Sequence, residues 1–337
     1  MATLVRSAAL TKYSGVAQAL GLDPERMVSH VGADRACLYM PDLRVPEPWI
    51  ADVFEASAKS ANCPAIGLLV AEVWRLSDFG PISLLLQHQP TLRHALAEME
   101  RYRHLLSDSV AMPVEEAGGV AIVRILLVTG RPDPGRQAIE LSVGVALSLM
   151  RALLGSAWMP RGVHFSHAAP TSYAIHSRVF GPKIEFGGEF DGIVLEQRDL
   201  DRPNPLADAT LARYAKELLA LQPRAGQESI AADTRRAIHV LMPQGHNTIE
   251  LVAPKLGLSS RTLQRRLEQE GEDFSSLVNE VRMELAARYL ADPRYPVSQV
   301  AMLLGFSQIS SFSRWFSTQF GLAPTRWRHD APGRAIG

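Results

Sequence analysis

The last hundred residues contain the same short pattern twice, and this repeat constrains the fold more than any other feature of the sequence. Four positions recur after 48 residues, so that Ala253, Leu256, Gly257 and Ser259 become Ala301, Leu304, Gly305 and Ser307. Three recur after 49, so that Leu263, Arg265 and Leu267 become Phe312, Arg314 and Phe316, and Gly271 recurs after 50 as Gly321. Two copies of one structural motif, with single-residue insertions, would produce this slowly drifting spacing.

Each copy predicts two helices joined by a tight turn. Its alanine lets the first helix approach the second closely, and its glycine suits a turn whose backbone angle is costly for other residues. In the second copy, Val297–Arg328, the turn falls at Gly305 and the second helix is expected over Ser310–Phe320. Phe312 and Phe316 are four residues apart, so both lie on one helix face and anchor it on a core.

The side chains left facing outward are small, polar or basic in both copies. They are Ser260, Arg261, Gln264 and Arg265 in the first copy, and Ile309, Ser310, Ser313 and Arg314 in the second. Arg can pair with two acceptors of guanine, Gln with adenine, Ser with several base edges, and Ile can pack on a thymine methyl group. Arg326 and Arg328 are better placed for phosphates, which position a protein without specifying sequence. These residues are the predicted DNA-binding set.

The distribution of charge favours the same interpretation, although the whole chain of 337 residues has a formal net charge of zero. Residues 230–337 contain 13 Lys and Arg against 10 Asp and Glu, which is +3 and leaves −3 for the rest. No acidic residue lies between Asp292 and Asp330, whereas four arginines do: Arg294, Arg314, Arg326 and Arg328. A modestly basic module therefore follows a modestly acidic one.

A long helix is expected between the two copies. Ser275–Ala291 predicts a spacer of about 25 Å at ~1.5 Å per residue. Two recognition helices held about one duplex turn apart, roughly 34 Å, can enter successive major grooves. Pro254 lies inside the first helix of the first copy if Thr248 caps that helix, and there it crowds a carbonyl at a cost of ~3 kcal/mol. We expect that helix to be kinked or to have an irregular first turn.

Upstream of the repeat, residues 1–221 predict an α+β domain. Helical patterns come first and end in a long amphipathic helix, Thr91–Ser107. The later expected strands are Ala121–Thr129, Arg161–Phe165, Lys183–Phe186 and Gly192–Glu196, and the later helices are Gln137–Leu154, Ser172–Phe180 and Asp208–Leu221. The helix at 137–154 is apolar nearly all round, which favours burial against the sheet. Residues 222–229 (QPRAGQES) are expected to be the linker to an all-α domain, 230–337.

The sequence predicts a soluble, cytoplasmic protein with no membrane partner. Cys37 and Cys63 form no CxxC motif, which favours buried, reduced thiols over a disulfide framework or a zinc site. The N-terminus lacks the long apolar core of a signal peptide. No run approaches the ~18 uninterrupted apolar residues of a membrane-spanning helix.

Motifs for catalysis are missing, so we expect neither an enzyme nor a cofactor. The chain has no GxSxG, P-loop, GxGxxG or HExxH motif. His164 and His167 lie three residues apart at a strand end, on opposite faces, and are interpreted as structural or surface residues rather than metal ligands. Arg124 is a charge within an apolar strand. We expect it to face solvent, with an acidic ligand in a pocket as the alternative.

From Ile230 to Arg328 the sequence resembles the DNA-binding domain of the AraC/XylS family of bacterial transcription regulators. The resemblance rests on LGLSSRTLQRRLEQEG (256–271), VRMELAARYL (281–290) and VAMLLGFSQISSFSRWFSTQFGLAPTRWR (300–328). Most of residues 1–215 resembles the arabinose-binding-type effector domain of one subgroup, typified by ornithine regulators, on the evidence of residues 79–110 and 163–203.

The resemblance implies an α+β effector domain followed by an all-α domain with two helix-turn-helix units joined by a long helix. It implies an activator that binds an asymmetric promoter site in double-stranded DNA, contacts RNA polymerase, and is controlled by a small-molecule effector or by homodimerisation through the N-terminal domain. One alternative is an effector-free regulator whose N-terminal domain only dimerises or binds a protein. Another is a DNA-binding module fused to an enzyme, which would need a reactive cysteine. An effector pocket is expected between sheet and helices.

Overall fold

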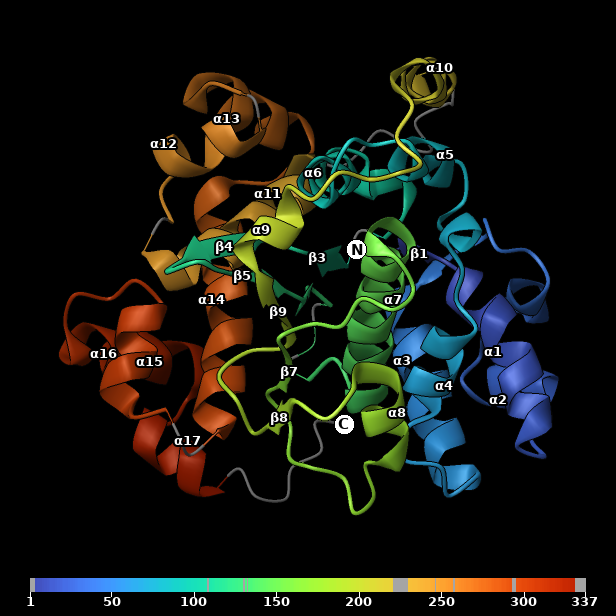
Figure 1. Ribbon diagram of the computed structural model, residues 1–337. Coiled ribbons are helices and arrows are strands. Elements are labelled where there is room, and N and C mark those ends of the chain that lie inside the picture. The colour runs from blue at the N-terminus through green and yellow to red at the C-terminus, as the bar shows by residue number, and fades with distance from the viewer. Residues whose placement is uncertain are drawn as a thin grey trace. The chain divides into compact units, whose positions relative to one another are not determined.

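The computed structural model describes residues 4–107, 109–129, 131, 133–220, 230–245, 247–256, 258–292 and 295–330 (Figure 1). The chain divides into two compact units. One comprises Met1–Thr129 and Pro134–Pro223, and the other comprises Gly130–Asp133 and Arg224–Gly337. The expected linker, 222–229, lies outside the described residues, and the exact domain boundary stays a prediction.

Helices dominate the start of the first unit, as predicted. They are α1 (Ala8–Ala19), α2 (Pro24–His30), α3 (Glu47–Ser60), α4 (Ile66–Glu72), α5 (Ile82–Gln87) and α6 (Leu92–Arg101). Asp23 shows how one of them starts, because its carboxylate accepts a hydrogen bond from the backbone N–H of Glu25 at 3.0 Å. Two short strands, β1 (Leu4–Arg6) and β2 (Arg44–Pro46), pair antiparallel and were not predicted.

A five-stranded sheet follows, with the order β4-β5-β9-β7-β8. Its strands are β4 (Val114–Ala117), β5 (Val120–Arg124), β7 (Gly162–Phe165), β8 (Ile184–Phe186) and β9 (Gly192–Glu196). All neighbouring pairs are antiparallel except β7 and β8, which are parallel. Gly118 and Gly119 join β4 to β5 at φ values of +58° and +81°, which suit a tight hairpin turn.

Two local expectations were wrong, and one strand of the sheet was not predicted. The strand expected over Ala121–Thr129 is two strands, because β5 ends at Arg124 and Leu126–Leu127 forms β6, which pairs with β3 (Val110–Ala111) in a separate sheet. The helix expected over Thr91–Ser107 ends at Arg101 and is followed by a short 3₁₀ turn. Strand β4 was missed because its sequence, VEEA, is acidic and mostly exposed, as an edge strand can be.

Helix α7 (Arg136–Leu154) is the central helix of the first unit and packs against α3, α4 and the sheet (Figure 1). It is the helix among the described residues that is long and apolar enough to cross a membrane, but 72% of that apolar window is buried inside the molecule. A Cβ on Gly144 would lie 2.5 Å from the Cβ of Ala71 in α4. Glycine therefore permits the close crossing of α4 and α7, and α7 is a core helix as predicted.

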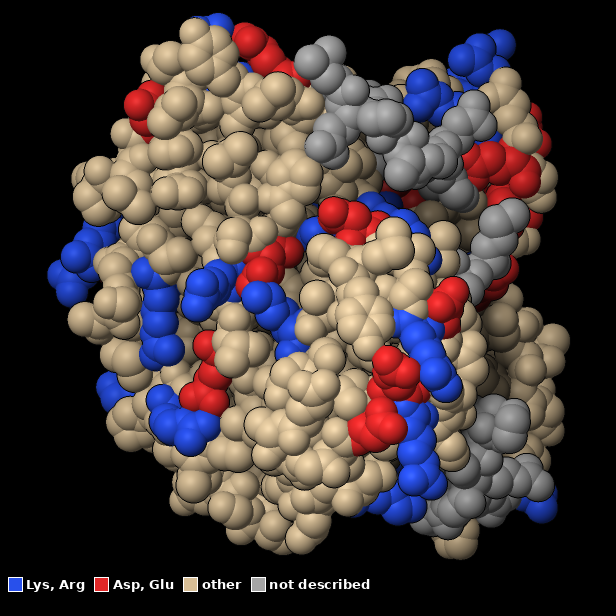
Figure 2. All heavy atoms as spheres, turned by 90° about the vertical axis from the view of Figure 1, so that its right-hand side faces the viewer, with Lys and Arg blue, Asp and Glu red and all other residues tan. Residues whose placement is uncertain are grey.

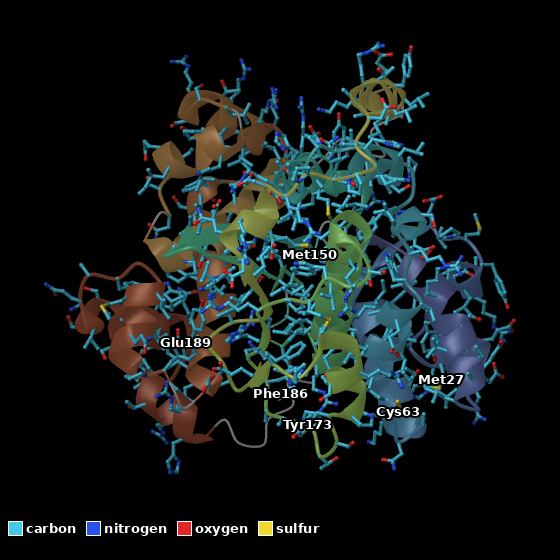
Figure 3. The ribbon with its side chains drawn as sticks, in the orientation of Figure 1. Met27, Cys63, Met150, Tyr173, Phe186 and Glu189 are labelled. Atoms are coloured by element: carbon cyan, nitrogen blue, oxygen red, sulfur yellow. The ribbon has the colours of Figure 1, made fainter. Side chains whose placement is uncertain are left out.

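The remaining elements of the first unit are α8 (Ala174–Phe180), α9 (Gln197–Leu200) and α10 (Ala209–Ala220). Beside α8, the ring of Phe186 stacks on Phe165 at 5.6 Å and meets Tyr173 at 6.3 Å; Figure 3 labels Phe186 and Tyr173. Within this aromatic group, buried His176 lies 2.9 Å from an oxygen of Glu140 in α7. This contact ties α8 to the central helix.

The second unit is helical throughout its described residues. Its helices are α11 (Ile230–Leu241), α12 (Ile249–Val252), α13 (Ser260–Gln269), α14 (Phe274–Ala291), α15 (Val297–Leu303), α16 (Ile309–Phe320) and α17 (Pro324–Asp330). One apolar cluster includes buried residues from both copies of the repeat and from α14. The predicted fold class, an α+β domain followed by two helix-turn-helix units on a long helix, is confirmed.

The face seen from the right-hand side of Figure 1, where α1 and α2 lie, carries acidic and basic side chains next to one another, separated by wide uncharged areas (Figure 2). Opposite charges also pair within the N-terminal compact unit. Arg35 lies 3.0 Å from Glu25, and Arg178 forms a pair with Glu72. This mixture of signs is that of an ordinary solvated surface.

Candidate DNA-binding site

The second helix-turn-helix unit is built as the sequence predicted. Helix α15 is followed by a turn at Gly305 and by α16. Gly305 has a φ of +78°, and a Cβ on it would lie 2.4 Å from the Nδ2 atom of Asn247. Glycine suits this turn because its backbone angle is costly for other residues, and any Cβ here would also have to displace the side chain of Asn247.

Aromatic side chains fix the orientation of α16 on the core. Phe312 and Phe316 are fully buried. Phe320 stacks on Phe316 with ring centroids 4.2 Å apart, and Trp327 of α17 meets Phe316 edge-on at 5.9 Å. With this inner face fixed, the opposite face of α16 can point only outward.

The outward face of α16 contains all the residues predicted for it. Ile309 is 50% exposed, Ser310 and Arg314 are exposed, and Ser313 is half-buried. They occupy positions i, i+1, i+4 and i+5, which form one strip along the first half of a helix. The N-terminal half of a recognition helix is the part that contacts base edges in helix-turn-helix proteins.

The first helix-turn-helix unit begins with a broken helix, as the position of Pro254 predicted. Helix α12 ends at Val252, and a 3₁₀ turn continues over Ala253–Leu256. Thr248 is the N-cap residue of α12, but its side chain makes no capping hydrogen bond. The proline is exposed within the tighter turn. The irregularity is therefore confined to the helix before the recognition helix.

Helix α13 is regular despite the break before it. The hydroxyl of Ser259 caps it by accepting a hydrogen bond from the backbone N–H of Thr262 at 3.2 Å. Leu263 and Leu267 are buried on its inner face. On its outer face Arg261, Gln264 and Arg265 are exposed and Ser260 is half-buried. These positions are again i, i+1, i+4 and i+5, so the strip of α16 recurs on α13.

The two units repeat each other in backbone hydrogen bonding as well as in sequence. The N–H of Leu258 donates to the carbonyl of Ala253 at 3.0 Å, and the N–H of Phe306 donates to the carbonyl of Ala301 at 2.9 Å. Gly271 ends α13 at a φ of +76°, and Gly321 ends α16 at +72°. The equivalent of Gly305 in the first unit, Gly257, lies outside the described residues.

Two polar residues of the spacer helix α14 hold α16 in place, and sequence analysis missed both. The side-chain oxygen of Asn279 accepts a hydrogen bond from the indole N–H of Trp315 at 2.7 Å. The guanidinium of Arg282 donates to the carbonyl of Leu304 at 3.1 Å and lies 4.8 Å from the ring centroid of Phe306. Burial lowers the pKa of Arg282. Both residues flank the buried apolar stripe of α14, which includes Val278 and Val281, and nothing in the local sequence marks their partners in the second helix-turn-helix unit.

The two predicted phosphate contacts have different surroundings. Arg326 is exposed on α17. Arg328 is half-buried, and its guanidinium donates to the carbonyl of Leu290 at 3.1 Å and to that of Tyr295 at 2.6 Å. Arg328 therefore holds the end of α14 and the segment after it. A phosphate contact for either arginine stays a prediction.

Helix α11 supports the first helix-turn-helix unit, and its buried and charged side chains contact α14. Arg235 forms ion pairs with Glu280 and with Glu284, the latter at 3.0 Å. Burial raises the pKa of Glu284, against the opposing effect of Arg235. Burial, reinforced by the positive charges of Arg288 and Arg235, lowers the pKa of His239 from 6.5 to about 4. His239 is therefore neutral in the folded protein near pH 7.

The other residues singled out in the sequence have local partners. Arg124 forms an ion pair with Glu115 at 2.7 Å, and its guanidinium lies 4.5 Å from the ring centroid of Phe190. His164 lies 3.3 Å from Glu185 and stacks on Phe190. Across the described ranges no group of three or more His, Cys, Asp and Glu residues could hold a metal ion.

The two cysteines are buried free thiols. Burial, together with the charge of Asp34, raises the pKa of Cys37 to about 11. A thiol with so high a pKa is protonated at neutral pH and is a poor nucleophile. This disfavours the alternative in which the DNA-binding module is fused to an enzyme that uses Cys37 as its reactive cysteine.

Comparisons with known proteins agree with both halves of this architecture. Residues 21–204 match the family model described as the arabinose-binding domain of AraC transcription regulators, at their N-terminus. Residues 252–330 match a helix-turn-helix domain model. The first match alone covers more than half of the chain. The chain belongs to the AraC family of transcription regulators.

Two AraC-type relatives match this chain over 79% to 97% of their own length. The transcriptional regulator VirS of Mycobacterium tuberculosis (strain ATCC 25618 / H37Rv) is 29% identical over 331 residues, 97% of each chain. The ornithine utilization regulator of Pseudomonas aeruginosa is 26% identical over 271 residues, 80% of this chain and 79% of the relative. A crystal structure of the regulator CdpR from Pseudomonas aeruginosa covers 95% of this chain and 96% of its own, at 22% identity and a TM-score of 0.47.

Proposed function

We propose that this AraC-family regulator binds promoter DNA with α13 and α16 in successive major grooves, and that it activates transcription from the bound promoter. The observation that carries the proposal is the matched strip on the two helices. Each strip occupies positions i, i+1, i+4 and i+5 of a helix whose opposite face is buried in the same apolar cluster. Because both recognition helices pack on the same apolar cluster, the distance between them is defined.

The chemistry of the strips suggests different tasks for the two helices. Arg261, Gln264 and Arg265 are long donors and acceptors that suit guanine and adenine edges. Ile309, Ser310 and Ser313 are short, and among them Ile309 suits a thymine methyl group. Arg314 adds one long basic side chain to the second strip. Arg326 and Arg328 are proposed to act at phosphates, and for Arg328 this would require exchanging part of its carbonyl contacts.

Selection of bound duplexes from a random pool, with the purified full-length chain, tests this proposal. The expected result is an asymmetric site with two conserved blocks centred about 10 base pairs apart, one for each recognition helix. A second selection with Arg265→Ala should lose preference in one block only, and one with Arg314→Ala in the other block only. A single conserved block, or loss in both blocks from either substitution, would contradict the assignment of one helix to each groove.

We infer that the N-terminal compact unit controls DNA binding through a small-molecule effector. Support comes from a cavity of about 170 Å³ formed wholly by first-unit residues, including residues of α1, α3, α6 and α7. Clefts of this kind, lined by apolar side chains with a few polar groups, are the usual form of small-molecule sites. RNA polymerase and a second copy of the chain are further proposed partners, and the cytoplasm is the proposed compartment. The alternative is an effector-free regulator.

Effector control is tested by measuring promoter affinity with and without metabolites that stabilise the protein thermally. A true effector raises the melting temperature of the first unit and changes the promoter dissociation constant. If no compound in a broad metabolite panel changes either quantity, the effector-free alternative is favoured. A reporter gene behind the selected site, measured with and without the regulator, decides between activation and repression.

A further inference from the structure

The cavity of the first unit has an apolar interior. Most of its lining consists of aliphatic and aromatic side chains, such as Ile50, Leu96, Met99, Leu127, Leu141 and Val145. They come from helices α3, α6 and α7 and from strand β6. An apolar protein cavity of about 150 Å³ accommodates benzene, so a volume of about 170 Å³ suits one ring with a small substituent.

The positive charges at the edge of this cavity are already neutralised within the protein. Arg6 lies 2.6 Å from a carboxylate oxygen of Asp42 and also donates to the carbonyl of Asp78. Arg103 lies 2.6 Å from Glu100. A carboxylate on a ligand would have to displace one of these partners in an apolar setting. It would also meet the buried carboxylate of Glu47, which lines the same cavity.

The hydroxyl groups of the cavity also have protein partners. Ser107 and Ser109 bond each other with their oxygens 2.9 Å apart. Ser142 donates to the carbonyl of Ala138 at 2.8 Å. These hydroxyls therefore gain little from a polar ligand, because bonding it would mean exchanging one partner for another.

Trp74 contributes a polar atom of a different kind. The residue lines the cavity, and its indole Nε1 is buried without a hydrogen-bond partner among the described residues. Its ring is held edge-on against Phe79, with centroids 5.9 Å apart. A buried indole N–H normally finds an acceptor, and leaving it unsatisfied is unfavourable. Nε1 has almost no accessible surface in the structure, so a ligand with a neutral oxygen would supply the missing partner after the indole turns toward the cavity.

We propose that the effector is a small neutral molecule with an apolar body of about one ring and a single hydroxyl or carbonyl oxygen that accepts a hydrogen bond from Trp74. This proposal rests on the effector control proposed above and narrows its chemistry. It separates this regulator from one that senses a charged amino acid, because ornithine would bring an ammonium pair and a carboxylate into an apolar cavity.

Calorimetric titration of the full-length chain with four probes tests the proposal. The probes are benzyl alcohol, toluene, benzoate and ornithine, which vary the oxygen and the charge. Benzyl alcohol should bind about tenfold more tightly than toluene, since it completes one buried hydrogen bond. Benzoate should bind more weakly than benzyl alcohol, and ornithine should not bind. Equal affinity for toluene and benzyl alcohol, tighter binding of benzoate or ornithine, or no binding of any probe would each overturn the proposal.

Two variants locate the binding. Trp74→Phe keeps a ring but removes the N–H, so it should lower the affinity for benzyl alcohol about tenfold and leave that for toluene within about twofold. Ser142→Leu adds volume from α7 and should weaken both probes together. Far-ultraviolet circular dichroism checks that each variant is folded. An unchanged preference for benzyl alcohol in folded Trp74→Phe would overturn the role of Trp74.

The outcomes separate the ligand class from effector control. If benzyl alcohol binds as expected but neither it nor any close relative changes promoter affinity, the cavity chemistry is supported and effector control fails. If ornithine or another charged compound binds the first unit and changes promoter affinity, effector control is supported and the neutral ligand class is overturned.

Discussion

The two helix-turn-helix units share a pattern but differ in how their recognition helices are supported. In the second unit, α16 is held by an aromatic cluster and by Asn279 and Arg282 of the spacer helix. In the first unit, α13 has leucine anchors and contacts α11, and a 3₁₀ turn replaces the last part of the helix before it. The same surface geometry is thus reached with different interiors. The repeated residues are mainly those of the turn and of the buried anchors, whereas only Arg265 and Arg314 match between the two outer strips.

The acidic residues after α13 show a further difference. From sequence, the run Glu268–Asp273 suggests that the first unit makes weaker contacts with a phosphate backbone. In the structure, the carboxylate of Glu270 accepts hydrogen bonds from the N–H groups of Ile230 at 2.7 Å and Ala231 at 3.1 Å. Asp273 caps α14 by accepting from the N–H of Ser276 at 3.0 Å. Two of these acids therefore stabilise helix N-termini, which reduces their effect on DNA.

The largest expected effect is the loss of an anchor beneath a recognition helix. Phe316→Ala should lower the free energy of unfolding by about 3–5 kcal/mol, and its matched change, Leu267→Ala, by about 2–5 kcal/mol. Both anchors belong to one apolar cluster. Hydrogen exchange of peptides from α13 and α16 should therefore report loosening in both units after either change. Loosening confined to the mutated unit would mean that the two units are independent.

The next largest effect is on the pH dependence of the stability of the C-terminal compact unit, which contains His239. Burial lowers the pKa of His239 to about 4, below its unfolded value of about 6.5. The unfolded chain therefore binds more protons between these values, so stability is fully present above pH 6.5 and is lost as the pH falls toward 4. The loss should be on the order of 3 kcal/mol. Urea unfolding at pH 7 and pH 4.5 measures it. His239→Gln should flatten this dependence, and identical profiles in both proteins would contradict the assignment.

Arg328 supports the second unit through backbone carbonyls. Arg328→Ala removes charged donors from the carbonyls of Leu290 and Tyr295, and should lower the free energy of unfolding by about 1.5–3 kcal/mol. If Arg328 also contacts phosphate, the salt dependence of DNA binding should become shallower by about one unit of slope. The comparison variant is Arg326→Ala, which removes an exposed arginine of the same helix and should also make the salt dependence shallower. Unchanged unfolding of Arg328→Ala would contradict the supporting role.

Arg265 and Arg314 are the matched basic residues of the two strips. Each change to Ala should cost about 1–3 kcal/mol in binding the selected duplex if the side chain reads a base. Competition with nonspecific DNA measures the specific component. We expect the larger loss from Arg314→Ala, because the rest of its strip is short. Equal and uniform weakening on all sequences would move both arginines to the phosphate backbone.

The smallest effect concerns the break in the first unit. Pro254→Ala permits a continuous helix from Ile249, and should change the free energy of unfolding by less than about 1 kcal/mol because Pro254 is exposed. Affinity for the block read by α13 should stay within about threefold, since Leu263 and Leu267 still fix that helix. A larger change in affinity would show that the break itself positions α13.

Much of the second helix-turn-helix unit could be predicted because its determinants are local. The spacing of Phe312 and Phe316 and the turn at Gly305 specify two helices and their inner face without knowledge of the rest. Prediction failed where partners lie far apart in sequence. Arg328 bonds a carbonyl 38 residues away, and Glu270 caps a helix 40 residues earlier. Neither contact produces a periodic pattern in the sequence from which it could be predicted.

The N-terminal compact unit was harder to predict for a related reason. Its strands are short, and a single pattern such as Ala121–Thr129 supplies strands to two sheets, because the chain changes partners after Arg124. The cavity was expected between sheet and helices, whereas its lining comes mainly from helices and includes none of the five-stranded sheet, and the lining residues could not be named from sequence. Side chains such as Trp74 and Leu127 meet there only because α7 brings distant segments together.

The spacer helix α14 has a consequence for the promoters that this protein recognises. It spans 18 residues without a break, and its buried face contributes to the apolar cluster shared by both units. Because DNA turns once in about 10 base pairs, each inserted or deleted base pair would rotate one block by roughly 35° relative to the other. A rigid protein cannot follow that rotation. If both recognition helices bind as proposed, the promoters of this protein can change individual bases over evolutionary time far more readily than they can change length between the two blocks.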